Sequence, residues 1–144
     1  MEPFAYFNND TYLGSPTVTN AASTDTTGLG WLASFIEQCD GCSIEFINIH
    51  WYDSAKNIDS FKQHIEDARN IRGRGDRPIW VTEFRASGTN EEVIKFLNDL
   101  MPWMNTTIDV HRYYFMARPG AGMSINEKGD RLSDIGEEYD FFDH

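Results

Sequence analysis

Hydrophobic residues along the chain fall into two patterns that recur in alternation. Short apolar runs rich in β-branched and aromatic residues predict strands, and they occupy residues 12–14, 45–51, 78–84 and 110–116. Apolar residues spaced three or four apart predict helices over residues 28–39, 57–72, 89–102 and 132–142. Strands that alternate with helices are typical of a parallel α/β fold.

The two middle strands are mostly apolar on both faces, which favours a parallel sheet or barrel with helices outside it. Thr89 and Glu92 form a capping-box pattern at the start of the third helix, which Pro102 is expected to end or bend. The Gly-rich connections between elements predict turns, so residues 1–144 are expected to form a single domain. Four β/α units are about half of the eight that close a barrel of roughly 250 residues.

Composition narrows the classes of partner. The chain has 144 residues, of which 40% are hydrophobic and 14% aromatic, as in a folded protein. Its net charge of −11 repels phosphate backbones and argues against nucleic acid. No run approaches the roughly 20 apolar residues of a spanning helix, so membrane insertion is not expected. No cofactor or metal is expected either, because the chain has no Gly-rich phosphate loop and no HExxH motif.

The only two cysteines stand close together, as Cys39-Asp-Gly-Cys42. They read either as a short disulfide or thiol pair at a helix end, or as a redox or metal half-site. The structural reading is favoured because no second CxxC exists. The amino terminus lacks the features of a secretory signal, whereas Asn9 and Asn105 begin glycosylation sequons that matter only in a secreted protein.

Reactive groups of parallel α/β folds lie at the carboxyl ends of strands. Alternation places His50 and Tyr52 on one side of their strand, with Asn48, and places Glu83 on the same side of its strand as Ile79 and Val81. If these strands are neighbours, His50 or Tyr52 can hydrogen-bond Glu83 and hold it ionised as a nucleophile. The alternatives are that Glu83 emerges into solvent or pairs with an arginine, Arg85 or Arg112, and that His50 is a core histidine.

Longer strings resemble a known family. They are LGSPTVTN (13–20), GLGWLASFIEQCDGCSIEFINIHWY (28–52), RPIWVTEF (77–84) and SINEKGDRLSDIGEEY (124–139). They resemble glycoside hydrolase family 128, endo-β-1,3-glucanases whose catalytic domain is similar to that of alkali-sensitive-linkage cell-wall proteins. The resemblance implies a (β/α)8 TIM barrel, a β-1,3-glucan substrate and an extracellular or cell-wall location.

The resemblance also implies roles for individual residues. Glu83 would be the nucleophile of a retaining mechanism, with His50 and Tyr52 as its partners. Substrate contacts would come from aromatic and polar side chains, namely stacking by Trp51, a lesser contact by Asn20, and Tyr113 or Tyr114 at the rim of the last strand.

One part of the family pattern has no counterpart. The family's acid/base glutamate lies in an Asn-Glu-Pro motif upstream of LGSP. Met1-Glu2-Pro3 looks like that motif, but only ten residues separate Glu2 from Leu13, too few for a crossover of a dozen or more. The chain is therefore expected to cover strands five to eight, without the acid/base residue and with little activity alone. The alternatives are a non-catalytic glucan-binding or cell-wall protein and an inactive fragment.

Overall fold

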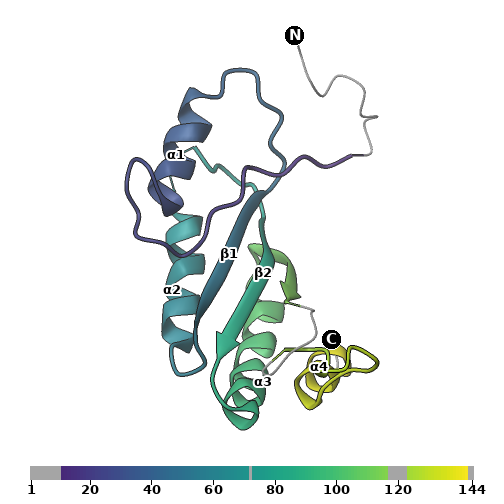
Figure 1. Cartoon of the computed structure of the whole chain (residues 1–144). Helices are drawn as coiled ribbons and strands as arrows, with labels where there is room; N and C mark the ends of the chain where they lie inside the picture. Colours follow the sequence, from purple (N-terminus) through teal and green to yellow (C-terminus); the bar gives the residue numbers. More distant parts are fainter. Residues whose placement is uncertain (1–10, 72, 117–122, 143–144) are drawn as a thin grey trace.

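The computed structural model describes residues 11–71, 73–116 and 123–142. A three-stranded parallel sheet lies at its centre in the order β1 (Ile47–Ser54), β2 (Ile79–Ser87) and β3 (Val110–Phe115). The helices are α1 (Gly28–Gln38), α2 (Ile58–Arg69), α3 (Asn90–Thr106) and α4 (Asp134–Asp140) (Figure 1). The described part of the chain is thus a partial α/β fold of the parallel type that the sequence predicts.

One face of the sheet carries the hydrophobic core. Trp51 of β1 packs against Phe61 of α2 and Phe96 of α3, with ring centroids 5.2 and 5.5 Å apart. Phe84 of β2 joins the same cluster, and its ring lies 5.3 Å from that of Phe115. Burying such a side chain contributes roughly 1.5–3 kcal/mol, so this face holds α2 and α3 on the sheet and leaves the opposite face free for polar residues.

A segment beside β1 takes the place of the short strand expected at residues 12–14. It makes isolated parallel bridges, Gly14 with Phe46 and Val18 with Ile49, and forms no regular strand. Pro16 lies between the two bridges and has no N–H to donate, which explains the interruption. The segment nevertheless covers the outer edge of β1, since the His50 N–H donates to the Val18 carbonyl over 2.8 Å.

A β-bulge corrects the expected alternation in β2. Ile49 pairs with Val81, but the next residue of β1, His50, pairs with Glu83. Thr82 is therefore an extra residue, and Val81 and Phe84 are both buried on the helix side. Glu83 consequently lies on the face opposite Ile79 and Val81 and not on their face, because the bulge resets the period of two.

Helix α3 extends further than the sequence predicts, and α1 is only partly buried. The capping box of Thr89 and Glu92 is present, and α3 continues through Pro102 to Thr106. Met101 and Met104 are fully buried on either side of the proline, so packing holds the helix together there. In α1, Leu32 is buried, whereas Trp31 and Phe35 are only partly buried and stack on each other at 5.6 Å.

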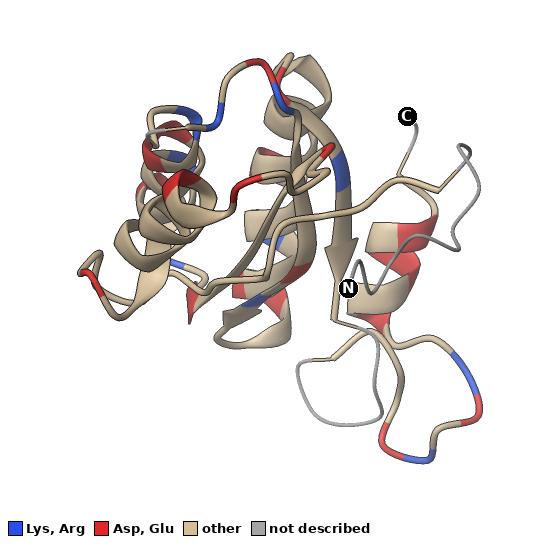
Figure 2. Cartoon of the chain, turned by 90° about the horizontal axis from the view of Figure 1, so that it is seen from above, with Lys and Arg blue, Asp and Glu red and all other residues tan. Residues whose placement is uncertain are grey.

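Acidic positions are spread over the molecule and recur along α4, as Figure 2 shows. Cys39 and Cys42 form a disulfide directly after α1, which is the first of the two structural readings. Of the helices in the described ranges, none is both long and apolar enough to span a membrane.

Candidate active site

Glu83, Tyr52 and His50 meet near the middle of β1 and β2, since both strands continue beyond the ends that the sequence predicts. The Tyr52 hydroxyl donates a hydrogen bond to Oε2 of Glu83, and Nδ1 of His50 lies 3.7 Å from the same oxygen. The Glu83 side chain is 45% exposed, whereas that of His50 is 20% exposed. A carboxylate reachable from solvent is thus held from one side through a single oxygen.

Both partners of Glu83 are held in place by further hydrogen bonds. The side chain of Asn20 bridges the backbone of Tyr52, accepting from its N–H over 3.0 Å and donating to its carbonyl over 3.1 Å. Nε2 of His50 lies 2.9 Å from Oγ1 of Thr82. Because both amide atoms of Asn20 bond the backbone of Tyr52, the residue positions Tyr52. A lesser contact of Asn20 with substrate stays a prediction.

The pKa values follow from this geometry. Burial, the hydrogen bond to Glu83 and the charge of Glu83 together raise the pKa of Tyr52 to about 12, so its hydroxyl keeps the proton that it donates. Burial lowers the pKa of His50, and the charge of Glu83 opposes that shift without cancelling it. At neutral pH the site therefore holds a phenol and an uncharged imidazole around the carboxylate.

Trp51 lies outside this cluster. Its side chain is fully buried and points toward α2 and α3. The prediction that it stacks on a sugar is wrong, because residues 51 and 52 of a strand face opposite sides of the sheet.

The two tyrosines of β3 face opposite sides as well. Tyr113 packs on Phe84, with centroids 6.3 Å apart, and its hydroxyl donates to Asn105 over 2.8 Å, so it faces the helices. Tyr114 is 47% exposed. It alternates with Tyr113 and therefore shares the face of the sheet that carries Glu83. Of the two candidates, Tyr114 is the one that faces the site.

Sequence reasoning did not single out Thr82 and Asn48, although both belong to the site. The Thr82 hydroxyl donates to Oδ1 of Asn48, whose Nδ2 donates to Thr17 over 2.5 Å. Alternation with His50 was a usable signal for Asn48. Nothing in the sequence marked Thr82, because a regular strand would turn it away from Glu83.

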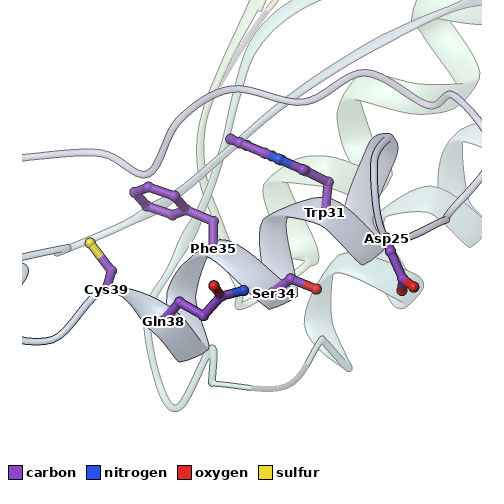
Figure 3. Close-up of a pocket in the computed structure, with 6 residues that line it drawn as sticks. All are labelled: Asp25, Trp31, Ser34, Phe35, Gln38 and Cys39. Carbon is purple, nitrogen blue, oxygen red and sulfur yellow. The ribbon is translucent and has the colours of Figure 1, made fainter.

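The described residues form neither an arginine ion pair with Glu83 nor a metal site. Within residues 11–71, 73–116 and 123–142, Glu83 makes no ion pair with Arg85 or Arg112, and the Arg112 guanidinium lies over the Trp80 ring at 5.2 Å. The same residues contain no group of three or more His, Cys, Asp or Glu side chains placed to hold a metal ion. A hollow on α1 is separate from the site, being lined by Asp25, Trp31, Ser34, Phe35, Gln38 and Cys39 (Figure 3).

A parallel sheet with helices packed on one face, alternating with its strands along the chain, defines a partial α/β domain. The chain belongs to the family described as glycosyl hydrolase catalytic core, whose model matches residues 1–139. Alkali-sensitive linkage protein 1 of Schizosaccharomyces pombe (strain 972 / ATCC 24843) is 30% identical over 142 residues, covering 89% of this chain and 24% of that protein.

Two solved structures of glycoside hydrolase family 128 are similar in fold. A curdlan-specific exo-β-1,3-glucanase of subgroup III from Blastomyces gilchristii, in complex with glucose, gives a TM-score of 0.75 at 31% identity, covering 91% of this chain and 54% of that chain. An endo-β-1,3-glucanase of subgroup II from Sorangium cellulosum gives 0.73 at 25% identity, covering 89% and 54%. The chain thus spans about half the length of these structures and about a quarter of the curated relative.

Proposed function

We propose that Glu83 is the nucleophile of a retaining hydrolase that cleaves β-1,3-glucan. The observation that carries the proposal is the shared use of one oxygen: Tyr52 and His50 both face Oε2. The other oxygen, Oε1, is left for attack. The β-1,3-glucanase activity of the similar structures from Blastomyces gilchristii and Sorangium cellulosum supports this substrate class.

The reaction has two steps. Oε1 attacks the anomeric carbon as the bond to the glycosidic oxygen breaks, and that oxygen takes a proton from a carboxylic acid. The resulting glycosyl ester on Glu83 is then hydrolysed by water, which gives its proton back to the same acid/base group. The Tyr52 hydrogen bond holds the Glu83 side chain in its orientation during the first step.

The acid/base group is not evident among the described residues. Retaining hydrolysis needs two carboxyl groups roughly 5–5.5 Å apart. Asp53, another carboxylate at this edge of the sheet, is engaged in accepting hydrogen bonds from the Ser54 N–H and the Asn57 side chain at 2.7 and 2.9 Å. Glu2 lies outside the described residues. We assign the acid to the part of the barrel that the relatives have and this chain does not cover.

The proposal therefore includes an architecture. The chain, as one unit of residues 1–144, supplies strands five to eight of a (β/α)8 barrel. Without the acid it loses about 10²–10⁴ in rate, so little hydrolysis of polysaccharide is expected from it alone. Tyr114 is the aromatic side chain that we assign to stacking on a sugar ring, since it is exposed on the face of Glu83.

We further propose an extracellular or cell-wall location. The Cys39–Cys42 disulfide fits an oxidising compartment. The sequon asparagine Asn105 is exposed at the end of α3, where a glycan would be accessible to the transferring enzyme.

A substrate that needs no acid isolates the nucleophile. An activated aryl 2-deoxy-2-fluoro-β-laminaribioside has a leaving group that departs unprotonated, and the fluorine slows hydrolysis of the glycosyl ester. Mass spectrometry of the treated chain is expected to find the added sugar on the peptide that contains Glu83. Glu83→Gln is expected to lose the label, whereas Glu127→Gln, an exposed matched control, retains it. A label on another residue, or none on a folded chain, overturns the proposal.

Hydrolysis of the polymer is tested in a completed domain, in which this chain is joined to the part of the Blastomyces gilchristii domain that it does not cover. Release of reducing sugar from laminarin is expected there and is lost in Glu83→Gln. Laminarin binding that survives Glu83→Gln with no hydrolysis in either form would instead indicate a glucan-binding protein.

A further inference from the structure

The two ring nitrogens of His50 face two consecutive residues of β2. Nε2 lies 2.9 Å from Oγ1 of Thr82, and Nδ1 lies 3.7 Å from Oε2 of Glu83. Consecutive residues of a regular strand point to opposite faces. Only the bulge after Val81 lets both side chains reach the same imidazole, so the bulge has a consequence for the chemistry of His50.

The hydrogen bonds behind Thr82 determine which nitrogen of His50 carries hydrogen. Nδ2 of Asn48 donates to Thr17, so the other amide atom, Oδ1, can only accept. The Thr82 hydroxyl donates its single hydrogen to that Oδ1. Oγ1 of Thr82 is then left to accept from His50. Nε2 therefore carries a hydrogen, and in the neutral ring Nδ1 keeps its lone pair.

We propose that Thr82 is a positioning residue that holds His50 in the Nε2–H tautomer, with Asn48 and Thr17 behind it, and so presents an unprotonated Nδ1 to Glu83. The effect on catalysis rests on the proposed function of Glu83, whereas the tautomer does not. A proton that His50 takes up enters at Nδ1, between the ring and Oε2. The imidazolium then lies beside Oε2 and withdraws negative charge from the nucleophile, whereas the neutral ring leaves that charge available for attack.

The surroundings of His50 contain few other titratable groups within the described ranges. On β1, Tyr52 lies edge-on to the imidazole with centroids 6.1 Å apart. From α2, His64 contacts the backbone of His50. The segment beside β1 contributes the Val18 carbonyl, which is uncharged. Glu83 is thus the carboxylate that faces the ring, and a proton on Nδ1 lies on the side of the ring toward Oε2.

The tautomer is measured directly by long-range ¹H–¹⁵N NMR on the ¹⁵N-labelled chain, at a pH above the pKa of His50. The His50 signals are identified by their loss in His50→Gln. The wild-type chain is expected to show a protonated Nε2 and an unprotonated Nδ1. Thr82→Val is expected to shift the population toward the Nδ1–H form, and Thr82→Ser to retain the wild-type form.

A second variant tests the same chain of bonds from its other end. In Asn48→Ala the Thr82 hydroxyl loses its acceptor and becomes free to donate to Nε2, so the population is again expected to move toward Nδ1–H. A wild-type His50 in the Nδ1–H form overturns the proposal. So does an unchanged tautomer in both Thr82→Val and Asn48→Ala.

Kinetics of the completed domain separate positioning from mere stability. Thr82→Val is expected to lower kcat about five- to tenfold, the contribution of one hydrogen bond. Its acidic limb is expected at lower pH, because the imidazolium loses the acceptor of its Nε2–H. Thr82→Ser restores both values, whereas a purely structural role would change stability without moving the limb. If Glu83→Gln remains active, the proposed function falls while the NMR result stands.

Discussion

Glu83 pairs with His50 across β1 and β2, although regular pairing after Ile49 and Val81 would place Thr82 there. The bulge turns the carboxylate onto the open face of the sheet, where the Tyr52 hydroxyl reaches it. In a regular strand the same glutamate would point into the apolar layer under α2 and α3. The one inserted residue therefore determines where this carboxylate lies. Without it the carboxylate would be buried in the apolar layer at a cost in stability, and with it the carboxylate is accessible for reaction.

Tyr52→Phe is expected to lower the kcat of the completed domain roughly 10–100-fold on laminarin. The variant removes one hydrogen bond to a charged group, which contributes about 1.5–3 kcal/mol, and leaves Glu83 without its donor. Tyr12→Phe is the matched control, because Tyr12 is 71% exposed and no part of the site. Equal losses in the two variants would contradict the assigned role of Tyr52.

Glu83→Gln is expected to lower the pKa of Tyr52 from about 12 toward the ordinary value of about 10. Two of the three causes of the raised value, the hydrogen bond and the charge, come from Glu83. Phenolate absorbance during an alkaline titration measures the change, and Tyr52→Phe identifies which transition belongs to Tyr52. A transition that stays in place in Glu83→Gln would show that burial alone sets this pKa.

The same shift predicts the direction of alkaline stability. The folded-state pKa of Tyr52 lies above its unfolded value, so its contribution to the free energy of unfolding is complete below about pH 10 and is lost as the pH rises through about 12. Glu83→Gln is therefore expected to lose less stability than wild type over that window. Chemical denaturation at a series of alkaline pH values provides the comparison.

Much of the fold was predictable because burial follows the period of the sequence. The apolar runs around Ile47 and Ile79 became neighbouring parallel strands, and the capping box at Thr89 began α3 where expected. The segment around Pro16 was not predictable as an irregular edge, because its bridges depend on where β1 lies. The sequence pattern also predicted that Pro102 ends or bends the helix. Helix α3 instead continues through it, because the buried side chains of Met101 and Met104 hold the helix against the core.

The site was only partly predictable. The proximity of Tyr52 and Glu83 followed from neighbouring strands, and both residues meet in the structure. The face of the sheet on which Glu83 lies could not be derived from the sequence, because a β-bulge produces no recognisable pattern of apolar and polar residues in a single sequence. Trp51 was wrongly assigned to stacking on a sugar. The family resemblance rests on the string IHWY (49–52) and does not show which of its side chains points into the core.

Trp51→Ala and Tyr114→Ala are expected to separate stability from binding. Trp51 is fully buried between two phenylalanine rings, so its loss is expected to cost about 3–5 kcal/mol of unfolding free energy. Tyr114 is exposed, so its loss is expected to stay within about 0.5 kcal/mol but to weaken laminaripentaose binding about 3- to 10-fold. Urea denaturation and calorimetry of the completed domain measure the two effects. Weakened binding in a still-folded Trp51→Ala with normal binding in Tyr114→Ala would reverse the assignment.

Asp109 joins the end of α2 to the start of β3 through two arginines. Its carboxylate accepts from Nε of Arg69 at 2.5 Å and from Nη2 of Arg74 at 2.9 Å, and the Arg74 side chain is only 8% exposed. Asp109→Asn leaves a buried guanidinium without its counter-charge. The expected loss is about 2–3 kcal/mol, below the roughly 3–5 kcal/mol of a fully buried pair, because Asp109 itself is 26% exposed. Asp99→Asn, which breaks only the exposed pair with Lys95, is the matched control and is expected to change stability by less than about 0.5 kcal/mol.

The difference between wild type and Asp109→Asn is also expected to depend on pH. Burial raises the pKa of Asp109, but the hydrogen bonds and charges of Arg74 and Arg69 lower it by more than burial raises it. The folded-state pKa therefore lies below its ordinary value. A depressed carboxyl pKa contributes stability that is complete above the unfolded value of about 3.9 and is lost as the pH falls through the folded value. Urea denaturation at about pH 7 should therefore show the full difference, and below about pH 3 a smaller one. A difference that persists unchanged in acid would assign the effect to packing of the side chain and not to its charge.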